Sequence, residues 1–135
     1  MSASAPDLTS KKGKNVVAWV LQVLLAAVFV AAGSAKLAGV AMMVQIFDQL
    51  GLGQWFRIVT GLVEVAGAVA LVVPGLAGAG ALWLGATMFF AALAHFTVLP
   101  GSAVPAICLL LLTLIVAWLR REELTAVLAR LQGAR

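Results

Sequence analysis

Charged residues are scarce in this sequence. Asp, Glu, Lys and Arg make up only 10% of its 135 residues, whereas 64% are hydrophobic. A soluble domain of average composition carries about a quarter charged residues, so this composition excludes an ordinary water-soluble domain and predicts a membrane protein. Tyrosine is absent and no basic stripe with interleaved aromatic residues occurs, so no nucleic-acid partner is expected.

Cysteine and histidine are equally rare. The single cysteine, Cys108, excludes an internal disulfide and a CxxC redox pair, and we expect it to be a small apolar core residue. The single histidine, His95, belongs to no metal-ligand spacing, so no metal site is predicted. The sequence also lacks a phosphate-binding loop and a nucleophile elbow.

Long apolar runs dominate what is present. A spanning helix needs roughly 20 apolar residues, and four segments approach or exceed that length, separated by glycine and proline turn signals. The sequence therefore predicts an all-α fold, an integral membrane four-helix bundle. Its helices are expected at about residues 15–37, 55–73, 76–99 and 103–119.

Three regions are expected along the chain. Residues 1–14 should form a basic disordered tail, residues 15–119 the transmembrane domain, and residues 120–135 an amphipathic basic tail on the membrane surface. Between the first two spanning helices, residues 40–50 carry apolar side chains at helical spacing. They predict a short amphipathic helix in the membrane interface.

The basic residues predict the orientation. Four spans place both chain ends on one side, and seven of the nine Lys and Arg residues then lie on that side. Basic residues near spans mark the cytoplasmic face, so both termini should be cytoplasmic. The two exceptions are Lys36 and Arg57.

Glu64 is the carboxylate in the second apolar segment. A carboxylate at the bilayer centre costs on the order of 3 kcal/mol on insertion scales and usually faces a partner inside the bundle. In the four-span topology, Lys36 and His95 reach comparable depth, in the outer half of the bundle. We therefore expect an intramembrane polar cluster of Lys36, Glu64 and His95, with Arg57 and Thr60 as further contributors.

The cluster has two interpretations. One is a structural Lys36–Glu64 pair that fixes helix packing without adding much stability, because desolvation offsets much of the Coulomb gain. The other is a ligand-binding or proton-handling site, in which the imidazole of His95 beside a carboxylate carries a proton. The sequence leaves both open.

Three segments resemble motifs of the DoxX family. They are Phe29-x-x-x-Gly33-x-x-Lys36-Leu37, then Glu64-x-x-Gly67-Ala68-x-x-Leu71, and the stretch from Met88 through Ala91 to His95. The resemblance covers about residues 28–96. It implies a multi-pass protein of the bacterial inner (plasma) membrane, linked to respiratory quinone chemistry and associated with other membrane or soluble redox proteins.

Two functions follow as hypotheses. The chain is expected to be a subunit or accessory protein of a membrane redox system, with membrane lipids around it and a homo-oligomer as one arrangement. In one form of this hypothesis the polar cluster only fixes the bundle and the protein is a scaffold. In the other a quinone binds the cluster, with His95 donating to a carbonyl and Glu64 exchanging the proton. The alternative is a small-molecule-binding, lipid-binding or transport protein with no redox role.

Overall fold

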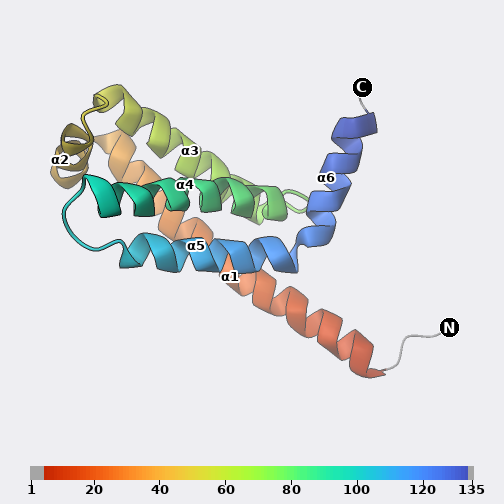
Figure 1. Cartoon of the computed structure of the whole chain (residues 1–135). Coiled ribbons are helices and arrows are strands. Elements are labelled where there is room, and N and C mark those ends of the chain that lie inside the picture. Colours follow the sequence, from red (N-terminus) through yellow and green to blue (C-terminus); the bar gives the residue numbers. More distant parts are fainter. Residues whose placement is uncertain (1–4, 134–135) are drawn as a thin grey trace.

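The computed structural model describes residues 5–133, and over that range it contains six helices and no strand (Figure 1). This confirms the all-α prediction. The five later helices begin and end within about two residues of the predicted segments. The helices are α1 (Ala5–Ala38), α2 (Ala41–Leu50), α3 (Gln54–Val72), α4 (Ala77–Thr97), α5 (Val104–Leu119) and α6 (Arg121–Gly133).

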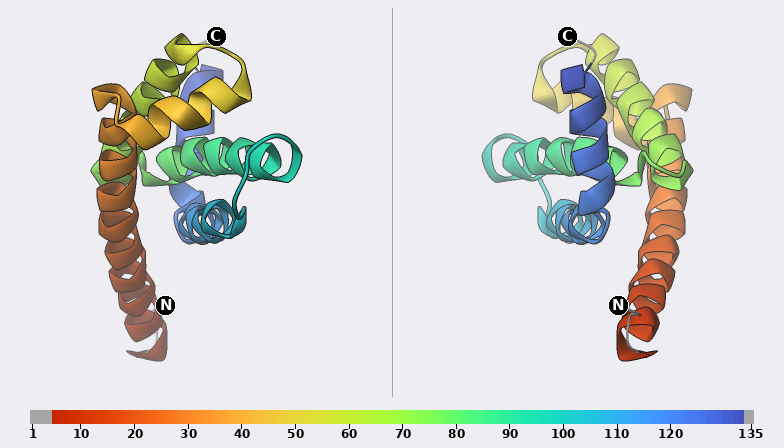
Figure 2. Two further views of the ribbon diagram at one scale, coloured as in Figure 1. Left: turned by 90° about the vertical axis from the view of Figure 1, so that its left-hand side faces the viewer. Right: turned by 90° about the vertical axis from the view of Figure 1, so that its right-hand side faces the viewer.

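Four of the helices pack around a shared core. Helix α1 lies against α3, α3 against α4, α4 against α5, and α5 returns to α1 (Figures 1 and 2). Apolar side chains from all four fill the space between them, and alanines on α4 and α5 allow the backbones to approach. The short helix α2 covers one end, and α6 turns away from α5 by 71° at the other. The larger apolar core residues include Leu25, Phe29, Leu71, Leu84, Met88 and Val116.

The closest approach of α1 and α3 occurs at two glycines. A Cβ atom on Gly61 would lie 2.9 Å from the carbonyl oxygen of Gly33, and one on Gly33 would lie 2.9 Å from the carbonyl oxygen of Gly61. Only hydrogen fits at either position, so the two backbones touch there. Small residues serve the same purpose at many helix contacts in membranes.

The outer surface is apolar. Large hydrophobic side chains are exposed on every long helix, among them Leu24, Leu62, Phe90 and Leu114. Helices α1, α3 and α4 are long and apolar enough to span a membrane, and α5 with α6 would make a fourth span if this bent pair is counted as one. The lengths of these helices and the apolar outer surface are those of a multi-pass membrane protein.

Helix α1 begins earlier than predicted. It starts at Ala5, whereas the start was predicted near Asn15, so the predicted disordered tail is helical from Ala5 onward. Pro6 stands in the first turn, where its missing N–H causes no loss, and no proline follows it in the helix. Side chains from Lys11 to Val17 are all exposed, so this end of α1 extends past the packed helices. Residues 1–4 and 134–135 of the predicted tails lie outside the described range.

The prediction for Cys108 was wrong. Its side chain is exposed, whereas the inner face of α5 is formed by Ala106, Thr113, Val116 and Ala117. Two residues advance a helix by about 200°, so Cys108 points away from the core on the side opposite Ala106. A helix that is apolar all round gives no sign in its sequence of which face is buried.

Candidate functional site

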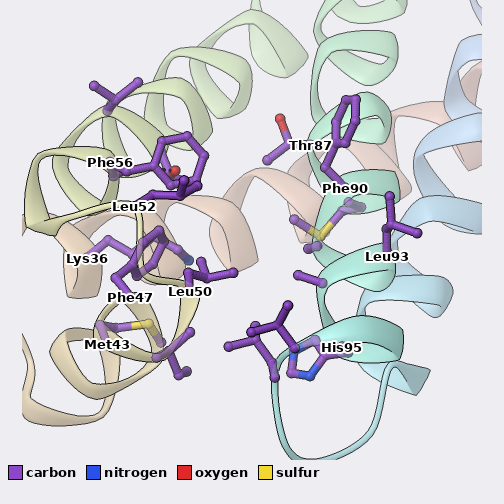
Figure 3. A pocket seen from close by; sticks show the side chains of 18 of the residues that line it. Lys36, Met43, Phe47, Leu50, Leu52, Phe56, Thr87, Phe90, Leu93 and His95 are labelled. Atoms are coloured by element: carbon purple, nitrogen blue, oxygen red, sulfur yellow. Dashed lines mark hydrogen bonds between the residues drawn. The ribbon is translucent and has the colours of Figure 1, made fainter.

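A pocket opens between α2, α3 and α4. It has a volume of about 690 Å³, within the range of roughly 300–1,000 Å³ that small-molecule sites occupy. Figure 3 shows Met43, Phe47 and Leu50 on one wall, facing Phe90 and Leu93 of α4 across the cavity. The lining is mainly apolar. Its polar members are Lys36, Thr60, Glu64, Thr87, His95 and Thr97.

An ion pair joins two of these polar residues. Nζ of Lys36 donates to Oε2 of Glu64 at 3.0 Å, and the side chains are only 12% and 3% exposed. Lys36 lies in the last turn of α1 and Glu64 in the middle of α3. Side chains on a helix lean toward its N-terminus, so the lysine stem extends back into the protein. That direction brings its ammonium group to the depth of the carboxylate.

The pair keeps hydrogen-bonding capacity for a ligand. An ammonium group carries three N–H donors, and Lys36 uses one of them on Glu64. Among the described residues, the donor to the Glu64 carboxylate is Lys36, which binds Oε2. Oε1 is therefore left to accept a hydrogen bond from another group. Both residues line the pocket. The arrangement can therefore present a donor and an acceptor to a bound molecule.

His95 occupies the α4 wall of the same pocket (Figure 3). Its Nδ1 lies 3.2 Å from the carbonyl oxygen of Pro100. A carbonyl only accepts, so Nδ1 is the donor in this contact, which leaves Nε2 as the acceptor in the neutral form of an imidazole. The hydrogen bonds of the described residues do not link His95 to Lys36 or Glu64. The three predicted residues thus share one cavity, but the ion pair is the direct contact between them.

Arg57 and Thr60, expected as further contributors to the cluster, both donate to backbone carbonyls. Arg57 donates through Nη1 to the carbonyl oxygen of Lys36, and through Nε to Gln54 at 2.8 Å. This carbonyl, which also accepts from the backbone N–H of Gly39 at 3.2 Å, lies at the end of α1, where a cation is favourable. Arg57 is therefore a positioning residue for Lys36. Thr60 lines the pocket, and its hydroxyl donates to the carbonyl of Phe56 at 2.8 Å.

The apolar face of α2 belongs to the pocket. The amphipathic helix predicted at residues 40–50 is present as α2, and its residues Met43, Ile46, Phe47 and Leu50 all line the cavity. Phe47 is buried, and its ring centroid lies 5.9 Å from that of Phe56. Helix α2 packs on α3 and α1. It thus closes one side of the pocket.

A second polar cluster was not predicted. Gln22, 1% exposed, donates through Nε2 to the carbonyl of Leu71 at 2.7 Å and accepts from Nε of Arg120 at 2.8 Å. Arg120 also donates through Nη1 to Oδ1 of Asn15 at 2.9 Å. The cluster ties α1 to α3 and to the junction of α5 and α6. The amide of Gln22 inside an apolar run could have indicated a buried polar contact. Nothing in the sequence, however, identifies its partner Arg120, which is 98 positions away.

The donor types in the pocket fit an organic ligand. Across the described residues, no group of three His, Cys, Asp or Glu side chains is placed to hold a metal ion. The pocket instead combines an ammonium group, a carboxylate oxygen and an imidazole nitrogen with apolar walls. Such walls suit the apolar body of a lipid-soluble molecule, and the polar groups suit its oxygen atoms.

The architecture defines a multi-pass helical membrane protein with an ion pair beside an apolar pocket. A family model described as the DoxX-like family matches residues 20–130. The chain belongs to this family, which confirms the resemblance of the three motifs. The match includes Lys36, Glu64 and His95. No curated protein and no solved structure matches the chain.

Proposed function

We propose that this DoxX-like protein binds a quinone in the pocket between α2, α3 and α4, and that it serves as a subunit or accessory protein of a membrane redox system. One observation carries the proposal: a buried Lys36–Glu64 pair lines a mainly apolar cavity of about 690 Å³. A charge pair that only fixed helix packing would have no need to border a cavity.

Each polar group has a role toward the quinone ring. Lys36 would donate to one ring oxygen, and Oε1 of Glu64 would accept from a hydroxyl group at the same end. His95, whose Nδ1 is engaged by Pro100, would accept through Nε2 from a hydroxyl group rather than donate to a carbonyl. This reverses the role expected for His95 and favours the reduced, hydroxyl-bearing form of the quinone.

The apolar walls have a separate role. Met43, Phe47 and Phe90 surround the cavity and would exclude water from the head group while accommodating part of an isoprenoid chain. A bound quinone supplies two-electron, two-proton chemistry, and a partner redox protein would exchange the electrons. The protein's own contribution is to bind and orient the ring and to hold protons at Glu64 and His95.

The proposal includes a membrane orientation. Helices α1, α3, α4 and α5 would form a four-helix transmembrane bundle in the bacterial plasma membrane, with both termini in the cytoplasm. In support, the two ends of the described chain lie toward the same side of the molecule (Figure 1). Lys11, Lys12 and Lys14 belong to the first half of α1, and Arg121 is the first residue of α6. The pocket would then lie in the outer half of the membrane.

Copurification tests the proposal. Protein extracted from its native membrane in mild detergent should retain a quinone detectable by mass spectrometry, and the double variant Lys36→Met/Glu64→Gln should lose it. Thr97→Val is the matched control, because Thr97 lines the pocket while its hydroxyl is bound to its own helix. Retention of phospholipid alone, equal in all three proteins, would overturn the quinone proposal and favour a lipid-binding or scaffold role.

A further inference from the structure

Two cations approach one tryptophan ring at the end of the molecule away from the pocket. Nζ of Lys14, on α1, lies 5.7 Å from the ring centroid of Trp118, and Cζ of Arg121, on α6, lies 4.7 Å from it. Arg121 also donates through Nη1 to the carbonyl oxygen of Trp118 at 2.9 Å. The ring, 57% exposed, thus gathers positive charge from two helices far apart in the sequence.

No carboxylate among the side chains of residues 11–133 neutralises this positive charge. Within that range the ion pair is Lys36–Glu64, and neither Lys14 nor Arg121 has a carboxylate at ion-pair distance. Glu123, close in sequence, instead accepts from the backbone N–H of Gly78 at 3.3 Å. Nη2 of the neighbouring Arg120 is buried without an acceptor among the described residues. The exposed cations Lys14 and Arg121 are thus available to bind an anion.

The surroundings indicate which anion fits. Exposed valines of α1, Val16, Val17 and Val20, begin within one turn of Lys14 and continue into the apolar surface of the protein. Tryptophan and basic side chains mark the level of the lipid head groups. A ligand bound here meets positive charge at one end and an apolar surface at the other. A free phosphate ion would use only the first of these.

We propose that Lys14, Trp118 and Arg121 form a binding site for the phosphate group of an anionic phospholipid. The two cations bind the phosphate, Trp118 holds both in place through its ring, and the acyl chains lie along the exposed valines of α1. The site joins the start of α1 to the junction of α5 and α6, so a bound lipid links the two chain ends. It is separate from the pocket and does not depend on the quinone proposal.

Native mass spectrometry of the full-length protein in detergent tests the site. Phosphatidylglycerol, phosphatidylcholine or inorganic phosphate is titrated separately. Phosphatidylglycerol should bind best, and Lys14→Gln/Arg121→Gln should weaken it roughly tenfold, in line with the contribution of basic residues near anionic lipids. The control Lys11→Gln/Lys12→Gln removes the same charge from exposed residues of α1 that do not contact Trp118, so it should weaken binding clearly less than the first pair.

Three outcomes would overturn the proposal. Equal weakening by both pairs of substitutions would mean diffuse surface charge rather than a site. Equal binding of phosphatidylglycerol and phosphatidylcholine would remove the anion requirement, and competition by millimolar inorganic phosphate would identify an ion site without lipid selectivity. Trp118→Leu keeps both charges and should also weaken phosphatidylglycerol binding. Circular dichroism of each variant identifies any loss of helix, and Trp118→Leu tests the site if the double variant unfolds.

Discussion

Nζ of Lys36 lies 3.0 Å from Oε2 of Glu64, joining the last turn of α1 to the middle of α3. Both side chains are nearly buried, and both border the pocket. The pair therefore connects the packing of two helices with the chemistry of the cavity. Its two contributions, to stability and to ligand binding, can be separated by choosing which partner is removed.

Removing the lysine alone should destabilise the protein. Lys36→Met leaves the Glu64 carboxylate buried without its partner, and breaking a buried pair in this way costs about 3–5 kcal/mol. The double variant Lys36→Met/Glu64→Leu removes both charges and should recover most of that loss. Unfolding in detergent, followed by circular dichroism, measures both free energies. A single variant as stable as the wild type would contradict a buried ion pair.

Widening the contact between α1 and α3 should also destabilise the fold. Gly61→Val places side-chain atoms where even a Cβ would lie 2.9 Å from the Gly33 carbonyl oxygen. Overpacking of this kind costs about 1–3 kcal/mol, and the same unfolding assay measures it. Gly13→Ala is the control, because a Cβ there meets no atom within 4 Å. It should be neutral or stabilising by up to about 1 kcal/mol. Equal effects at both glycines would refute the close approach.

The second polar cluster should support the fold rather than the pocket. Gln22→Leu leaves the Leu71 carbonyl and Nε of Arg120 without their partner, a loss of about 1–3 kcal/mol for each unsatisfied group. Ligand affinity measured on the folded fraction should stay unchanged. Gln49→Leu serves as the control, since Gln49 is exposed on α2. Loss of ligand binding without loss of stability in Gln22→Leu would show that the cluster acts on the pocket.

His95 should distinguish ligands by their hydroxyl groups. Its Nδ1–H is bound to the Pro100 carbonyl, so Nε2 accepts a hydrogen bond. His95→Phe should weaken a hydroxyl-bearing quinol analogue about fivefold, the equivalent of a hydrogen bond worth about 1 kcal/mol. The O-methylated analogue should bind the variant and the wild type alike. Isothermal calorimetry in detergent measures each affinity, and equal losses for both analogues would exclude an acceptor role.

Local sequence signals account for most of the fold. Apolar runs broken by Pro74-Gly75 and Pro100-Gly101 locate α3, α4 and α5 closely, because each run and each turn is determined by neighbouring residues. The depth of Glu64 and Lys36 also follows from counting residues along helices. These two features are predictable because they depend on helix length and the order of the spans alone.

The remaining features depend on which way helices face. Cys108 was placed in the core because α5 is apolar on every side and its sequence does not indicate the buried face. Arg57 was expected near Glu64, but its guanidinium group reaches the end of α1 instead. The Gln22–Arg120 contact joins residues 98 positions apart. Each outcome is set by tertiary packing, which periodicity in a single sequence does not encode.

A direct quinone titration tests whether the pocket binds a quinone at the Lys36–Glu64 pair. Wild-type protein and the double variant Lys36→Met/Glu64→Leu, both reconstituted in nanodiscs of neutral lipid, are titrated with a short-chain quinol while tryptophan fluorescence and calorimetric heat are recorded. Saturable binding to the wild type is expected, with at least about tenfold weaker binding to the double variant, since two polar contacts are lost. Equal affinity in both folded proteins, or no saturable binding to the wild type, would contradict it.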